Sequence, residues 1–165
     1  MSRSIEQLML ALKQEYDIYR DYLDLAKKKK DIIIKGQVKE LDYITSLEQD
    51  MILKMGKIDK IRTIIIGNLL RELGVKEIAN ITELLKYIDE DRGRKLLSLR
   101  EKLEDTIEEV QEINTLNGQL IEQSLEYVTF NLNLLNSVRT EGTTYGNRAD
   151  EKNIQKRLNV FDAKI

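Results

Sequence analysis

The sequence has 165 residues, a length that suits one domain, and its 27 Lys and Arg nearly balance its 29 Asp and Glu. This balance gives no electrostatic reason to expect nucleic acid or an anionic membrane as the partner. His and Cys are both absent, which removes the commonest general base, the commonest metal ligand and any disulfide, so we expect neither an enzyme nor a bound cofactor or metal.

The rest of the composition is typical of long helices. Charged residues of both signs are interspersed with plentiful Leu and Ile, and no Pro is present to force a helix to end. The longest apolar stretch, residues 64–70, is much shorter than the ~18 residues that a membrane-spanning helix needs. Residues 1–12 lack the pattern of a signal peptide. We expect a cytoplasmic, all-α protein without membrane insertion.

The first predicted helix covers residues 4–35. Ser4 is placed to cap its start, with Gln7 three residues on as in a capping box, and Gly36 is a natural end. The lysines at 27–30 lie near the end of this helix, where positive charge complements the helix dipole. Steps of three and four define one apolar stripe, formed by Ile5, Leu8, Leu12, Tyr16, Tyr19, Leu23, Ala26 and Ile33.

The second predicted helix covers residues 38–73 and ends at Gly74. Because the joint at Gly36 is short, the two helices should fold back as a hairpin, with a single bent helix as the alternative. Glu48 and Arg62 interrupt its apolar stripe. That stripe is Val38, Leu41, Ile44, Ile52, Met55, Ile58, Ile66, Leu69 and Leu73.

Residues 75–93 are less regular. Thr82 is placed to cap a short helix over residues 83–89, and Gly93 marks a bend.

The third long helix is predicted over residues 94–140. At 1.5 Å per residue it reaches roughly 70 Å, which is more than either partner helix can cover, so its end should project. Its stripe is Leu96, Leu99, Leu103, Ile107, Val110, Asn114, Asn117, Ile121, Ser124, Val128, Leu132 and Leu135. The predicted architecture is an elongated antiparallel bundle of three long helices plus a short linking helix over residues 1–140.

Residues 141–165 are predicted to form a flexible tail, because their few apolar side chains cannot offset the entropy cost of ordering them. Ile154, Leu158, Phe161 and Ile165 nevertheless follow steps of four, three and four. This spacing predicts a latent amphipathic helix that would form on meeting a surface.

Polar side chains enter the third stripe at Asn114, Asn117 and Ser124. They are either a polar layer that fixes the register of the bundle or part of a groove that stays soluble while it waits for a partner. Gly118, between them, marks a close approach or a bend.

Residues 120–138 are the richest apolar stretch of the sequence, and their apolar side chains occupy more than one face of the helix. A helix that overhangs its neighbours cannot bury all of these faces, and an exposed apolar patch commonly marks a partner site. Recognition of a helix in an apolar groove suits this geometry.

Several segments resemble the FlgN-like flagellar export chaperones. Residues 113–135, INTLNGQLIEQSLEYVTFNLNLL, are similar to the pattern near the end of the family's last long helix. Thr144-Tyr145-Gly146 is similar to its aromatic-glycine tail motif. Residues 15–44 and the pair Glu48 and Arg62 are similar to its first two helices.

The resemblance implies a cytoplasmic chaperone that binds the C-terminal amphipathic segment of hook-associated proteins of the FlgK and FlgL type. It would prevent their premature assembly and deliver them to the type III export gate, where the partner is FlhA. Tyr145 is the residue implied for docking at the gate. The implied cargo-binding residues are Leu120, Ile121, Leu125, Val128, Leu132 and Leu135.

Two alternatives stay open at this point. A structural coiled-coil adaptor would have the same long stripes and would bury residues 120–138 in a constitutive oligomer. A secretion chaperone for another cargo, such as flagellin, would share every feature above. Either a monomer or a homodimer is compatible with the sequence.

Overall fold

The computed structural model of the protein describes residues 2–138, and within them all regular structure is helical. Three long helices, α1 (Ser2–Lys35), α2 (Val38–Leu73) and α4 (Glu90–Val138), account for most of these residues. The short helix α3 (Ile81–Leu84) and one 3-10 turn, η1 (Leu85–Tyr87), lie in the connection between α2 and α4. The predicted all-α fold of three long helices with a short linking helix is confirmed.

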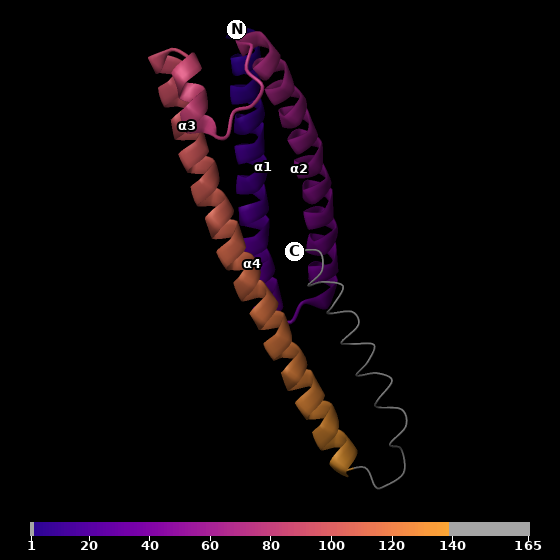
Figure 1. Ribbon diagram of the computed structural model, residues 1–165. Helices are drawn as coiled ribbons and strands as arrows, with labels where there is room; N and C mark the ends of the chain where they lie inside the picture. Colours follow the sequence, from indigo (N-terminus) through magenta and orange to yellow (C-terminus); the bar gives the residue numbers. More distant parts are fainter. Residues whose placement is uncertain (1, 139–165) are drawn as a thin grey trace.

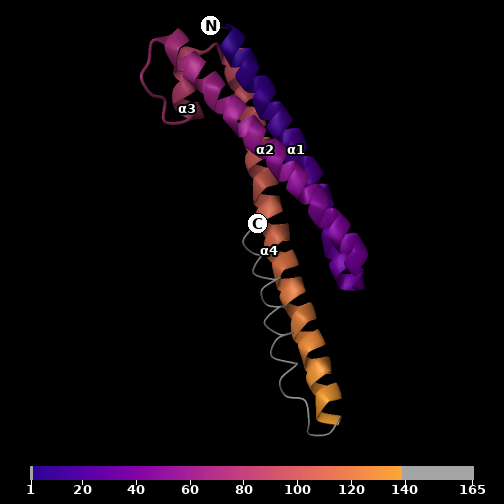
Figure 2. The same cartoon turned by 90° about the vertical axis from the view of Figure 1, so that its right-hand side faces the viewer.

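The helix α1 is the centre of the arrangement (Figure 1). It packs against both α2 and α4, whereas α2 and α4 hardly approach each other in the described chain. Helices α1 and α4 start at the same end of the molecule and run in the same direction. Helix α2, which comes between them in the sequence, runs in the opposite direction. The view in Figure 2 shows α1 and α2 together as a narrow hairpin, with α4 extending well past its closed end. The result is an elongated molecule.

The predicted hairpin at Gly36 is confirmed. Gly36 has a φ of +69°, in the left-handed region that glycine adopts without strain. Its N–H donates to the carbonyl of Ile33 at 3.1 Å, and the N–H of Gln37 donates to the carbonyl of Ile32 at 3.2 Å. These two bonds satisfy carbonyls that the end of α1 would otherwise leave unpaired.

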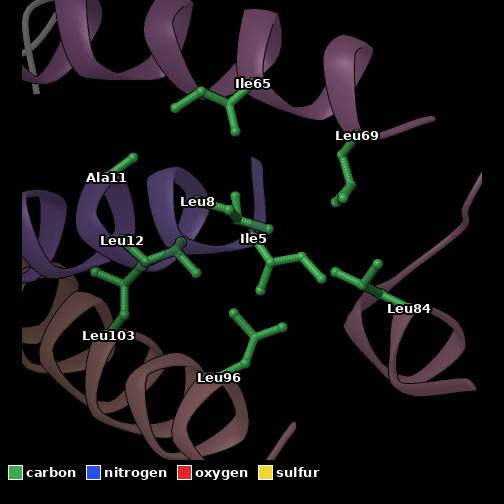
Figure 3. Close-up of a cluster of buried hydrophobic side chains, with 9 residues drawn as sticks. All are labelled: Ile5, Leu8, Ala11, Leu12, Ile65, Leu69, Leu84, Leu96 and Leu103. Carbon is green, nitrogen blue, oxygen red and sulfur yellow. The ribbon is translucent and has the colours of Figure 1, made fainter. Parts of the chain in front are cut away.

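The apolar core is concentrated at the end of the molecule where α1 and α4 begin (Figure 3). Side chains from α1, α2, α3 and α4 meet there, and Leu84 of α3 closes the end of the cluster. Leu96 is fully buried, and Leu103, seven residues later on α4, lies beside Leu12 of α1. The cluster comprises Ile5, Leu8, Ala11, Leu12, Ile65, Leu69, Leu84, Leu96 and Leu103.

The face that α2 turns toward α1 differs from the predicted stripe. Val38, Ile52 and Ile66 are exposed, so this part of the prediction is wrong, and Ile65 is buried in place of Ile66. One row of buried and half-buried positions follows alternating steps of four and three, and it includes both charged residues that were predicted to interrupt the stripe. Its members are Ile44, Glu48, Met51, Met55, Ile58, Arg62, Ile65 and Leu69.

Two ion pairs join α1 to α2, one buried and one partly buried. Lys29 Nζ lies 3.1 Å from Glu48 Oε2, with both side chains almost fully buried. Arg62 Nη1 donates to both carboxylate oxygens of Glu15 at 2.8 Å. Of the lysines at 27–30, which were assigned only to the helix dipole, Lys29 therefore also forms a buried contact with α2. A buried charge fits only opposite its partner, so these pairs favour one register of the hairpin.

Glu15 gives the hairpin a pH dependence. Burial raises the pKa of the Glu15 carboxyl, and the Arg62 guanidinium offsets only part of that rise. Between the usual carboxyl range and the raised pKa, the folded state binds more protons than the unfolded state, so stability falls as pH rises through this window.

Glu15→Gln is therefore expected to flatten the loss of stability between about pH 4.5 and the raised pKa. Urea unfolding at a series of pH values would measure this effect. Asp17→Asn, at an exposed carboxylate of the same helix, is the matched control. If the free energy of unfolding depends on pH with the same slope in the wild type and in Glu15→Gln, the Glu15 carboxyl titrates alike in the folded and unfolded chains.

Three local predictions are corrected by the structure. Ser4 lies inside α1, where its hydroxyl donates to Glu72. Asn80, not Thr82, caps the short helix, since its side chain accepts from the N–H of Glu83 at 2.9 Å. Gly93 is no bend but lies in the first turns of α4, where an added Cβ would meet Leu85 Cδ2 at 3.1 Å. The glycine thus allows the linking segment to pack closely on α4.

Candidate partner-binding surface on α4

The helix α4 extends beyond the closed end of the hairpin formed by α1 and α2. The side chain of Asn117 donates to the carbonyl of Ala26 at 2.9 Å, which aligns these two positions of α4 and α1. Because α1 ends at Lys35, nine residues after Ala26, its last residue is level with about Glu126. The remaining residues of α4, 126–138, extend roughly 18 Å further at 1.5 Å per residue. We call them the overhang (Figures 1 and 2).

The apolar stripe that α4 presents to α1 continues into the overhang. Along one row the residues recur every seven positions, which keeps them on one side of the helix. Ile107 packs against the core and Asn114 reaches Tyr22, so the start of this row faces α1. The row then continues to positions that α1 does not reach. Its members are Ile107, Asn114, Ile121, Val128 and Leu135.

The exposure of the side chains changes accordingly along α4. Leu103 and Val110 are buried, and Asn117 is completely enclosed. Leu120, Ile121 and Leu125 are half-buried. Val128 and Leu132 are each 43% exposed, and Leu135 is 63% exposed. The surface that comprises Leu120, Ile121, Leu125, Val128, Leu132 and Leu135 is called the distal face below.

A second group of apolar side chains is exposed on another side of the same segment. Tyr127 is 68% exposed, Phe130 60% and Leu134 49%. Because an α-helix turns by about 100° per residue, Phe130 lies on the side opposite Val128 and Leu134 on the side opposite Leu132, so a search for one stripe omits them. Apolar side chains exposed on more than one side of a helix are typical of a site for another chain.

A polar layer lies where the enclosed part of α4 gives way to the distal face. Asn117 is buried against α1, and the amide of Asn114 donates to the hydroxyl of Tyr22 at 3.4 Å. Burial raises the pKa of this hydroxyl, and the nearby Glu48 of α2 adds to the rise, so the layer involves all three long helices. Of the two interpretations of these asparagines, the structure supports a polar layer that fixes register.

Ser124 is not part of that layer. It is exposed, and its hydroxyl donates to the carbonyl of Leu120 one turn back. Gly118 causes no bend, because α4 continues through it, and an added Cβ would meet no atom of the described chain within 4 Å.

Gly118→Ala is expected to raise the free energy of unfolding by about 0.5–1 kcal/mol, because glycine in a helix interior is less favourable than alanine by that amount. Urea unfolding of the two proteins measures the difference. A loss of stability instead would show that the bare backbone at Gly118 is used in a contact made by residues outside 2–138.

The charges around the distal face are mostly of one sign. From Leu103 to Val138, α4 carries seven Asp and Glu and no Lys or Arg. Glu122 and Glu126 are those nearest the exposed apolar residues, and both point to solvent. In residues 2–138, no group of three or more His, Asp or Glu is placed to hold a metal ion. None of the described helices is long and apolar enough to cross a membrane. The surface offers apolar contact with acidic edges.

Two predicted features lie outside the described residues. One is Tyr145, the candidate for docking at the export gate. The other is the division of the chain at residue 140 into a bundle and a tail over residues 141–165.

One comparison with known proteins identifies a family. The family model described as FlgN protein matches residues 1–153, which is nearly the whole chain. No curated protein and no solved structure matches the sequence.

Proposed function

The chain belongs to the FlgN family of flagellar export chaperones for hook-associated proteins, and we propose that its distal face on α4 binds that cargo. The observation that carries the proposal is the continuation of one apolar stripe from the part of α4 that α1 covers into the part that it leaves exposed. The family is not enzymatic, which agrees with the sequence, where no His is available for acid-base chemistry.

The cargo in this proposal is the C-terminal amphipathic segment of proteins of the FlgK and FlgL type. Such a segment exposes apolar side chains that assemble with other copies, and a helix laid on the distal face would cover them. The segment would fold as it binds, so part of the contact energy offsets the ordering of its backbone. We therefore expect moderate affinity, which allows the cargo to be released.

Tyr127, Phe130 and Leu134 are candidates for a second contact with the cargo. They are well exposed and lie on the same segment of α4 as Val128 and Leu132, but on another side of the helix. Aromatic side chains contribute large contact areas with few rotatable bonds, which is why they are enriched at the centres of protein interfaces.

Delivery to the export gate belongs to the same proposal. The gate protein would be FlhA, the docking residue Tyr145, and the compartment the cytoplasm. Residues 1–140 would form the chaperone domain, and residues 141–165 a tail that carries the docking tyrosine.

The test of the cargo assignment is a calorimetric titration of the full chain with the C-terminal segments of the FlgK-type and FlgL-type proteins from the same genome. Saturable binding with a negative heat-capacity change is expected, because apolar surface is buried. The corresponding segment of flagellin is the matched control for cargo choice, and it should bind more weakly.

Light scattering on the free protein complements the titration. No binding to either hook-associated segment, together with a constitutive oligomer, would replace the chaperone proposal with a coiled-coil adaptor. Preferential binding of the flagellin segment would keep the chaperone and change its cargo.

A further inference from the structure

The distal face has a counterpart in the C-terminal residues of the same chain. Along α4, Ile121, Leu125, Val128 and Leu132 are separated by steps of four, three and four. The apolar residues of the C-terminal segment are separated by the same steps in the same order: Ile154, Leu158, Phe161 and Ile165. We propose that residues 147–165 fold as a helix on the distal face and cover it until another chain displaces them.

The length of the chain supports this pairing. Val138 is followed by 27 residues, and residues 147–165, if helical, extend roughly 28 Å at 1.5 Å per residue. A helix that returns antiparallel from the end of α4 would then reach back to about Leu120, so its length matches the distal face. Residues 139–146 are left to form the connection, and Gly142 and Gly146 suit its turn.

In this register the two sets of apolar residues lie side by side. Ile154 falls beside Leu132, Leu158 beside Val128, and Ile165 beside Ile121. Steps of three and four keep each set on one side of its helix, so all of these contacts can form at the same time.

The charges favour the same occupant. Residues 147–165 carry five Lys and Arg against three Asp and Glu, whereas the stretch of α4 that they would cover, from Leu120 to Val138, carries Glu122 and Glu126 and no base. The segment is therefore net positive where the helix beneath it is net negative. Val160 and Lys156 lie on the opposite side of the proposed helix from Leu158, so they would face solvent.

The proposed helix lies almost entirely outside the part of the chain that the family model matches. That match ends at residue 153, and the four apolar residues of the segment, at 154, 158, 161 and 165, all lie beyond it. Its regulatory half rests on the proposed function: if the distal face binds cargo, the segment competes for that face, and the free chaperone keeps its apolar surface covered. The segment is at high effective concentration because it is attached, so a weak contact is sufficient.

Disulfide trapping tests the contact without any cargo. The chain has no Cys, so the full-length double variant Val128→Cys with Leu158→Cys has a single possible intramolecular disulfide. Under mild oxidation it is expected to form several-fold faster than in the control Val128→Cys with Lys156→Cys. Equal rates in the two proteins, or a disulfide that joins two chains, would overturn the proposal.

Cargo titration tests the competition. Leu158→Asp in the full chain removes one of the contacts, and it is expected to strengthen cargo binding several-fold. Val160→Asp introduces the same change on the opposite side and is expected to bind cargo as the wild type does. If all three proteins bind cargo equally and the trapping rates are equal, this inference fails and the chaperone function stands. If trapping is selective but no protein binds cargo, the contact stands and the cargo assignment fails.

Discussion

Lys29→Met is expected to lower the free energy of unfolding by about 3–5 kcal/mol, the range found when one partner of a buried ion pair is removed. Lys29 Nζ lies 3.1 Å from Glu48 Oε2, and the two side chains are only 2% and 7% exposed. Met fills a similar volume, so the main loss is the positive charge. The carboxylate of Glu48 would then stay buried in the interface of α1 and α2 without this cation.

Urea unfolding measures the effect, and two further variants make it specific. Lys28→Met changes an exposed neighbour and should alter stability by less than about 0.5 kcal/mol. Adding Glu48→Leu to Lys29→Met removes both charges and should recover most of the loss, because an apolar pair can replace a buried ion pair at little or no cost. A double variant no more stable than Lys29→Met would show that the lysine acts through other contacts.

The ion pairs also show where reading the sequence falls short. A charged residue in an apolar stripe is ordinarily taken as an interruption, because isolated charges are rarely buried. In α2, however, the steps from Ile44 to Leu69 stay regular only when Glu48 and Arg62 are counted as members of the buried face. Their partners, Lys29 and Glu15, lie on another helix, and no local pattern identifies such pairs.

The prediction of Ile66 in place of Ile65 as the buried residue was wrong for the same reason, because the register depends on contacts with another helix. Three isoleucines follow one another at 64–66, so hydrophobicity alone cannot tell which one faces α1. The register set by Glu48 and Arg62 selects Ile65, which is buried, while its two neighbours are exposed. Sequence analysis thus predicts the helices and their hairpin well, because glycines and periodicity are local, and predicts the buried face less well, because pairing is not local.

Much of the candidate site could be predicted from length and composition. An apolar stretch near the end of a helix that is longer than its neighbours has to be partly exposed. In the structure, Val128, Leu132 and Leu135 are exposed. The half-buried state of Leu120 and Ile121 could not be predicted, because it depends on where α1 stops. The role of Asn117 was open for the same reason, since its partner is a backbone carbonyl of α1.

Val128→Asp is expected to weaken binding of the hook-associated segment by at least about 100-fold, or roughly 2.7 kcal/mol, because an unpaired carboxylate would be buried under the bound helix. The fold should be unaffected. Val128 is 43% exposed and lies beyond the end of α1, so the substitution leaves the apolar core intact. The free energy of unfolding, measured in urea, should therefore change by less than about 0.5 kcal/mol.

Gln119→Glu is the matched control. It adds the same charge to α4, nine residues before Val128 and on the opposite, exposed side of the helix, and it should leave cargo affinity within about twofold of the wild type. Equal losses in the two variants would mean that the added charge acts at a distance and that the contact lies elsewhere. Unchanged affinity in both would remove the distal face as the cargo site. A loss confined to Val128→Asp, with stability unchanged, would establish that the stripe α1 leaves uncovered is the surface the cargo occupies.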